Sequence, residues 1–341
     1  MLKYTKNPFL ISFAFLLFSI LFLSIFFNKI SRDKLVEQIQ HRQQMSVRAG
    51  ANSVESFLTS VGSMTTLLAI DPRIEAFDEF IKAWQDESIS GVVAADKNGL
   101  VYLHSERGNV ESEGQSVIER DYFEWARTAK KGEYKVFPAI VSKLGSSKGK
   151  YILPIASPVV KSDNFDGVVV VAVVLSDLVE HYINGLEILE SSDYYLVTNR
   201  GEIIYSTIPS LIGYKLEDLL ANKFLGSQII YDLIREEMAS EGDTVLNLAI
   251  PNSDRSHKLE PYLVNASTIK LADRNWKLVT TTPENDLKAF TFNFYSNQIL
   301  VIFITVAIFI MLTLRASKQT GYDQAVEDEH QRHNLGKHSK S

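Results

Sequence analysis

Residues 120–126 read RDYFEWA, and they are followed by GKYI at 149–152 and by an apolar run at 167–175. The first stretch places one arginine and three aromatic side chains on a short amphipathic segment, directly before a series of strand-like sequences. A small pocket between a helix and a sheet is built from elements of this kind. We therefore interpret residues 120–126 as one wall of a ligand pocket.

The arginine of this stretch is the main candidate for ligand contact. A guanidinium binds a carboxylate through two parallel hydrogen bonds, and neighbouring rings shield that pair from water. The alternative is a surface arginine that pairs with an adjacent acidic residue. Polar residues on the following strands add candidates, although each is also typical of an exposed position. The candidate ligand-binding residues are Arg120, Tyr122, Phe123, Trp125, Tyr134, Ser142, Lys143 and Tyr151.

Composition limits the class of protein. The chain has 341 residues, 45% of them apolar, no cysteine and a formal net charge of −6. This apolar content suffices for a packed core, and the lack of cysteine excludes disulfides, thiolate zinc sites and cysteine nucleophiles. A negative net charge, without a stripe of Lys and Arg interleaved with aromatic residues, argues against a nucleic-acid partner.

Two uncharged apolar runs, Pro8 to Phe27 and Phe294 to Leu314, are each long enough to cross a hydrocarbon layer of roughly 30 Å. A signal peptide is the alternative for the first run, but its apolar stretch exceeds the usual length and no small-x-small cleavage motif follows. Basic residues flank both ends of the first run, so the positive-inside count nearly cancels. We expect two lipid-embedded helices in the inner (plasma) membrane, both termini in the cytoplasm, and residues 29–293 outside.

A long helix is expected from Ile30 to Ile70, because apolar residues from Val47 to Leu68 recur at alternating spacings of four and three. Asp71-Pro72 ends it, since the residue before a proline avoids the helical region. Two alternatives stay open for this helix. It covers only its own domain, or it also pairs with a second copy in a homodimer.

Two groups of strands follow the helix. The first group has a hairpin around Asn98-Gly99, then an inserted helical segment and three Val- and Ile-rich strands. The same order of elements recurs about a hundred residues later, beginning with a hairpin around Gly201. The expected strands are 89–95, 100–105, 134–142, 151–160, 167–175, 194–198, 202–206, 262–269 and 276–281, and the later helices are 179–189 and 224–240.

The quoted motifs also carry a resemblance to a known family. RxYFxxA at 120–126, GKYILPIASPV at 149–159 and GVVVVAV at 167–173 resemble the membrane-distal unit of bacterial C4-dicarboxylate sensor histidine kinases. The arrangement from about 30 to 290 resembles the double Cache sensor domain, a tandem of PAS-like sheets outside the membrane. The resemblance implies a small-molecule ligand held by Arg120 and Tyr122. Dicarboxylate-sensing relatives carry a lysine on the last distal strand and amino-acid-sensing relatives an aspartate, whereas this chain has Ala172. One charged anchor is therefore missing, so the resemblance implies a small molecule with a single carboxylate and favours neither a dicarboxylate nor an α-amino acid.

We accordingly expect an α+β fold: a long N-terminal helix with two tandem PAS-like antiparallel-sheet subdomains, flanked by two transmembrane helices. The expected segments are a cytoplasmic N-terminus (1–7), transmembrane helix 1 (8–28), the long helix (29–72), a membrane-distal unit (73–178), a membrane-proximal unit (179–290), transmembrane helix 2 (294–314) and a disordered cytoplasmic tail (315–341).

Motifs for catalysis do not occur in the sequence. We find no Gly-x-Ser-x-Gly, His-Glu-x-x-His, Gly-x-x-x-x-Gly-Lys-Ser/Thr or Gly-x-Gly-x-x-Gly, and the tail after 314 is too short for a catalytic domain. We expect no enzyme activity, metal or cofactor.

The leading hypothesis is a two-pass receptor that senses a small carboxylate-bearing ligand. It would signal to a separate kinase, cyclase or chemotaxis-type partner, or to an output domain missing from this chain. The alternatives are an accessory membrane protein whose ectodomain binds another extracytoplasmic protein, and a membrane-tethered enzyme.

Overall fold

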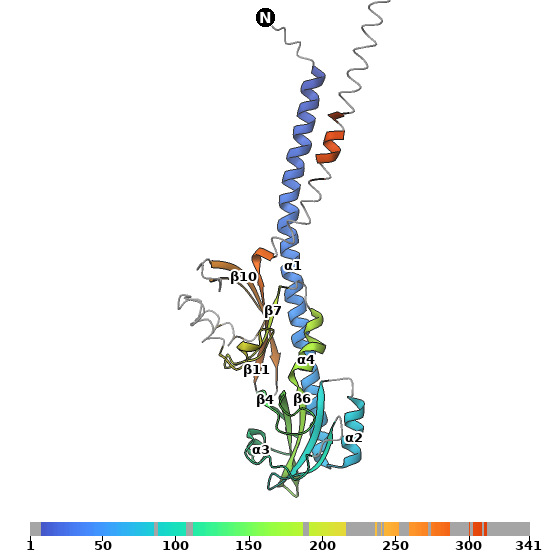
Figure 1. The fold of residues 1–341 in the computed structure, drawn as a ribbon, viewed down its shortest axis with the longest axis vertical. Helices are drawn as coiled ribbons and strands as arrows, with labels where there is room; N and C mark the ends of the chain where they lie inside the picture. Colours follow the sequence, from blue (N-terminus) through green and yellow to red (C-terminus); the bar gives the residue numbers. More distant parts are fainter. Residues whose placement is uncertain are drawn as a thin grey trace, which may run out of the picture. The chain divides into compact units, whose positions relative to one another are not determined.

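The computed structural model describes residues 8–84, 88–106, 112–186, 191–215, 236, 240, 242–251, 259–271, 274–286, 300, 303–308 and 310–311. The chain divides into two compact units, Met1–Gln38 with Leu287–Ser341, and Ile39–Asp286. The second unit contains both of the sheets (Figure 1). All residues that line the candidate site also belong to it.

One continuous helix, α1 (Pro8–Ile70), contains both the predicted N-terminal span and the predicted long helix. Within the second unit it buries the stripe expected from the sequence, with Val47 3% exposed and Val54, Leu58 and Val61 fully buried. The helix ends at Ile70, directly before Asp71-Pro72. The periodicity and the stop signal are therefore both confirmed.

The distal sheet lies against the last part of α1 (Figure 1). Its strands are β1 (Ile89–Asp96), β2 (Val101–Glu106), β3 (Lys135–Val136), β4 (Ile140–Val141), β5 (Tyr151–Lys161) and β6 (Asn164–Val174). Among the described residues the strand order is β2-β1-β6-β5-β3, with β4 also paired to β5, and all pairs are antiparallel. Helix α2 (Ile74–Ala83) precedes this sheet, and the short helix α3 (Asp121–Ala126) is inserted between β2 and β3.

The proximal sheet repeats this order. Helix α4 (Leu175–Tyr182) and the 3₁₀ turn η1 (Asn184–Leu186) lead from the distal sheet into it. Its strands are β7 (Asp193–Thr198), β8 (Ile203–Ser206), β9 (Thr244–Pro251), β10 (Leu259–Lys270) and β11 (Asn275–Pro283), and η2 (Pro209–Leu211) follows β8. The described order is β8-β7-β11-β10-β9, so each sheet begins with an edge hairpin and places its last strand in the centre. The predicted repeat is confirmed.

Three expectations need correction. The strand expected at 134–142 is two short strands, β3 and β4, because Pro138 lies between them and has no N–H for the ladder. The helix expected at 179–189 begins earlier, at Leu175, directly after β6. Strand β9 was not predicted. The helix expected at 224–240 lies outside the described residues, apart from 236 and 240.

Both sheets pack against α1, but through different contacts. The distal contact is apolar, with Phe57, Leu58 and Val61 in one cluster with the inner face of the sheet. The proximal sheet adds polar contacts. Gln43 Nε2 donates to Thr282 Oγ1 at 3.0 Å, and the Lys270 N–H donates to Glu55 Oε2 at 2.7 Å.

The membrane spans stay predictions. Among the described residues one stretch, Lys34–Ile70, is long and apolar enough to cross a membrane, yet 39% of its most apolar window is buried. Because its buried side chains join the core of the sheets, we assign this stretch to the domain. Exposed Phe18, Phe22 and Phe26 on the N-terminal part of α1 suit a membrane anchor. Most of the span expected at 294–314 lies outside the described residues.

We predict that Leu58→Ala lowers the free energy of unfolding by about 2–5 kcal/mol, because it leaves a cavity between α1 and the distal sheet. Chemical denaturation of the purified chain in detergent, followed by tryptophan fluorescence, measures this change. Met45→Ala is the matched control, since Met45 lies on the same helix at 47% exposure. We expect it to change stability by less than about 0.5 kcal/mol. Equal losses in the two variants would contradict the role given to the stripe.

Candidate functional site

A cavity opens on the outer face of the distal sheet, the face turned away from α1. Its size is about 40 Å³, where one water molecule needs roughly 10–15 Å³, so it suits a compact ligand. Alternate residues of the central strands form the floor of the cavity, because residues at i and i+2 share one face of a strand. The lining residues are Ser90, Gly91, Val93, Glu106, Arg120, Tyr122, Ile140, Ser142, Lys143, Leu144, Ser147, Ile152, Pro154, Val170 and Ala172.

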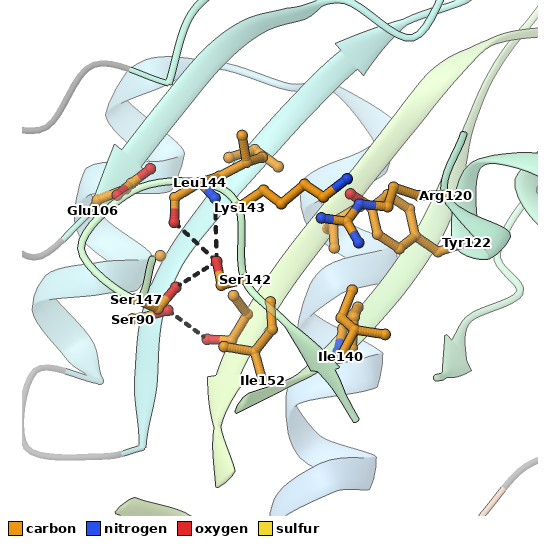
Figure 2. Close-up of a pocket in the computed structure, with 15 residues that line it drawn as sticks. Ser90, Glu106, Arg120, Tyr122, Ile140, Ser142, Lys143, Leu144, Ser147 and Ile152 are labelled. Carbon is orange, nitrogen blue, oxygen red and sulfur yellow. Dashed lines mark hydrogen bonds between the residues drawn. The ribbon is translucent and has the colours of Figure 1, made fainter. Parts of the chain in front are cut away.

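Helix α3 supplies one wall. Its buried residues Tyr122, Phe123 and Ala126 fix it on the sheet, and Asp121 and Glu124 stay exposed. Arg120 is the N-cap residue, with extended backbone, and its carbonyl accepts the Phe123 N–H at 2.9 Å. Its side chain therefore leaves the chain just before the helix begins, and it lines the cavity (Figure 2).

The turn between β4 and β5 supplies the opposite wall. Ser142 is 4% exposed, and its Oγ donates to the Leu144 carbonyl at 2.9 Å and accepts from Ser147 Oγ at 3.1 Å. The Gly149 N–H closes the turn on the Ser142 carbonyl at 2.9 Å. These bonds hold the turn rigid, and Lys143 extends from it across the cavity (Figure 2).

Two cationic groups meet in this cavity. Figure 2 shows the Lys143 ammonium and the Arg120 guanidinium pointing toward one another beside the Tyr122 hydroxyl. In the part of the chain that the structure describes, neither cation has a salt bridge to an acidic residue. The alternative of a surface Arg120 paired with Glu119, Asp121 or Glu124 is thus not what the structure has. Lys143 is exposed and Arg120 is half-buried, and two such neighbouring cations without a salt bridge can bind an anion.

Tyr122 is buried, at 6% exposure, and its ring packs edge-on against Phe137 at 6.1 Å. Burial raises the pKa of Tyr122 to about 12, and the nearby charge of Arg120 opposes that rise. The hydroxyl therefore stays protonated at neutral pH and is available as a hydrogen-bond donor to an anion.

The structure brings together four of the eight candidate residues, namely Arg120, Tyr122, Ser142 and Lys143. Phe123 is buried in the core, edge-on to Phe165 at 5.7 Å, and Trp125 packs against Phe137. Neither lines the cavity, because successive helical residues point about 100° apart and only Tyr122 faces it. The ligand-binding role of the candidates stays a prediction.

Tyr134 and Tyr151 also lie away from the cavity. Tyr134 packs over Gly62 of α1, where a Cβ would lie 2.2 Å from its ring, so it belongs to the inner face of the sheet. Tyr151 is 46% exposed at the start of β5, and the next residue, Ile152, faces the cavity instead. A shift of one residue along a strand reverses the face.

Sequence reasoning missed Glu106, Ser90 and Ser147 as lining residues. Glu106 reaches the site because it pairs with Gly91 across β1 and β2, a contact that depends on the sheet register. Ala172 does line the cavity, at the position where the resemblance placed a lysine or an aspartate.

The fold defines a class, that of domains in which two tandem antiparallel sheets pack on one long helix. A sequence model of the Cache domain matches residues 27–289, and the chain therefore belongs to the Cache domain family. No curated protein matches the chain.

Solved structures agree in fold. The ligand-binding domain of the Pseudomonas aeruginosa PAO1 amino acid chemoreceptor PctB, in complex with L-arginine, is 15% identical with a TM-score of 0.54, and the match covers 74% of this chain and 91% of that one. The ligand-binding domain of the Pseudomonas fluorescens chemoreceptor CtaA, in complex with L-isoleucine, is 15% identical with a TM-score of 0.53. That match covers 76% of this chain and 98% of that one. The sensor domain of the V. cholerae histidine kinase DctB is 14% identical with a TM-score of 0.50, and the match covers 72% of this chain and 98% of that one. At these identities the similarity concerns the fold alone.

We predict that stability falls between about pH 10 and pH 12 and that Tyr122→Phe removes part of this fall. The pKa of Tyr122 is raised above the unfolded value near 10, so its stabilising share is complete below pH 10 and is lost as pH rises toward 12. Melting temperatures of both proteins across this range measure the effect. Burial also raises the pKa of Tyr195 to about 12. Tyr195 is unchanged in the variant, so part of the loss of stability between about pH 10 and pH 12 should remain there. Identical pH profiles would contradict the assignment.

Proposed function

We propose that this chain is a two-pass membrane receptor that senses a small carboxylate-bearing molecule outside the cell through the distal cavity. The observation that carries the proposal is the meeting of Arg120, Lys143 and the Tyr122 hydroxyl over an apolar floor. A carboxylate there would accept a bidentate pair from the guanidinium and further bonds from the other two groups. The apolar lining would cover its hydrocarbon part.

The long helix offers a route for the signal. Helix α1 starts in the predicted first span and passes both sheets, and β11 ends at Pro283, eleven residues before the predicted second span. Ligand binding that favours one packing of these elements by tenfold needs only about 1.4 kcal/mol of differential affinity. The output would pass to a cytoplasmic kinase, cyclase or chemotaxis-type partner.

A homodimer is part of this proposal. Met64, Leu67 and Ile70 are 40%, 60% and 57% exposed on the distal end of α1, and they offer an apolar surface to a second copy. The rival proposal is an accessory protein whose ectodomain binds another extracytoplasmic protein through such a surface. An open cavity with two unneutralised cations favours the receptor, because a vestigial pocket needs no such charges.

We predict that the purified chain gains thermal stability with at least one compound from a panel of short carboxylates and amino acids, and that Arg120→Ala abolishes the gain. A ligand at 100 times its Kd stabilises by about 2.7 kcal/mol, which differential scanning fluorimetry detects. Arg127→Ala is the matched control, since Arg127 is exposed just after α3 and does not line the cavity. A carboxylate that stabilises the Arg120→Ala variant as much as the unmodified protein would refute the assigned site. A panel in which no compound stabilises the unmodified protein would count against the receptor proposal.

The two-pass arrangement predicts a labelling pattern. The chain has no cysteine, so single cysteines report position without background. In intact spheroplasts a membrane-impermeant maleimide should label Lys97→Cys, on the exposed distal hairpin, and should leave Lys3→Cys and Ser339→Cys unlabelled until the membrane is permeabilised. Labelling of either terminus in intact spheroplasts would contradict this topology.

A further inference from the structure

The two ends of the cavity carry opposite charge. Arg120 and Lys143 point toward one another at one end, and Glu106 lies at the other (Figure 2). The lysine side chain extends away from Glu106 toward the arginine, so the carboxylate and the two cations do not neutralise one another directly. A ligand whose carboxylate binds the cations would therefore direct its other end toward Glu106.

Glu106 is held in place by the two loops that border this end. Its Oε1 accepts from Ser112 Oγ at 2.5 Å, and its Oε2 accepts from the Ser146 N–H at 2.8 Å. Ser112 is fully buried, so the first contact is shielded from water. A carboxylate with a bond to each loop cannot rotate away when a second negative charge approaches.

Two glycines make room for this side chain. A Cβ on Gly145 would lie 1.8 Å from Glu106 Oε2, and a Cβ on Gly91 would lie 2.8 Å from its Cγ. Gly91 pairs with Glu106 on one side and with Ala172 on the other. The acidic side chain on β2 is thus separated from Ala172 on β6 by strand β1, and the short alanine places no charge between it and the ligand.

The charge of Glu106 is not balanced by a neighbouring cation in the described residues, because no salt bridge there includes it. Like charges brought together in a partly enclosed cavity repel one another, whereas an uncharged or cationic group is tolerated or attracted. Rejection by a fixed like charge is an effective way to discriminate between ligands of similar size.

We propose that Glu106 excludes dicarboxylates from the distal cavity, so that the ligand is a monocarboxylate whose far end is uncharged or cationic. This inference rests on the proposed function and specifies its ligand class. Glu106 is then a specificity-determining residue, distinct from Arg120, which holds the carboxylate common to all the ligands.

The test uses three short probes that differ at one end: butyrate, 4-aminobutyrate and succinate. Calorimetric titration of the full chain in nanodiscs should show butyrate or 4-aminobutyrate binding at least about tenfold more tightly than succinate, a difference of roughly 1.4 kcal/mol. In Glu106→Gln this preference should fall by about tenfold, mainly through tighter binding of succinate.

Glutamine preserves the structural contacts while it removes the charge. Its carbonyl accepts the Ser146 N–H, and its amide donates to Ser112 Oγ, which then acts as acceptor. Glu119→Gln is the control. This substitution removes the same charge, but Glu119 is exposed and does not line the cavity. Gly145→Ala, which displaces the carboxylate without removing it, should shift the preference in the same direction as Glu106→Gln.

Three outcomes would overturn the inference. These are succinate binding as tightly as butyrate to the unmodified protein, an unchanged preference in Glu106→Gln, and no binding of any of the three probes. The proposed function is tested separately, because Arg120→Ala should abolish binding of every carboxylate regardless of its far end. A protein that keeps the Arg120 dependence but prefers succinate would retain the receptor proposal and lose only the role of Glu106.

Discussion

The buried stripe of α1 is the constraint on which the rest of the structure depends. An antiparallel sheet must cover one apolar face, and neither sheet finds that cover within its own strands. Val47, Val54, Leu58 and Val61 provide it for both, because one side of a straight helix presents residues every three or four positions over many turns. Two sheets of similar topology are thereby held on one helix.

This constraint also decides where a ligand is able to bind. The inner face of the distal sheet is filled by α1, so only the outer face is available, and alternation assigns residues such as Val170 and Ala172 to it. Helix α3 and the turn after β4 cover that face from opposite sides, and each brings one cation. Under the proposed function, the affinity for a carboxylate would thus follow from two local insertions in a sheet whose position α1 has already set.

The sequence predicted the fold well because its signals are local and periodic. The stripe of α1, the hairpins around Gly99 and Gly201 and the Val-rich strands each need only a short window, and Gly99 and Gly201 indeed adopt positive φ values of 80° and 77°. The site was predicted in part. Arg120 and Lys143 are about twenty residues apart and were named from their neighbours, whereas Glu106 enters through a strand register and a gap left by Gly145, which no short window shows.

The two sheets have the same order but different chemistry on their outer faces, and under the proposed function this difference would separate sensing from transmission. On the proximal sheet the buried Lys277 already donates to the Gly242 carbonyl at 3.0 Å, so its charge is engaged by the protein itself. That sheet adds directional polar pairs to its apolar contacts with α1, such as Gln43 with Thr282 and Arg48 with Asp243. The partly exposed pair of Arg48 with Asp243 exchanges partners with water at low cost, while the apolar distal interface tolerates little displacement. Under the proposed function, a ligand would therefore move the distal sheet and α1 together, and the change would be taken up at contacts such as that of Arg48 with Asp243.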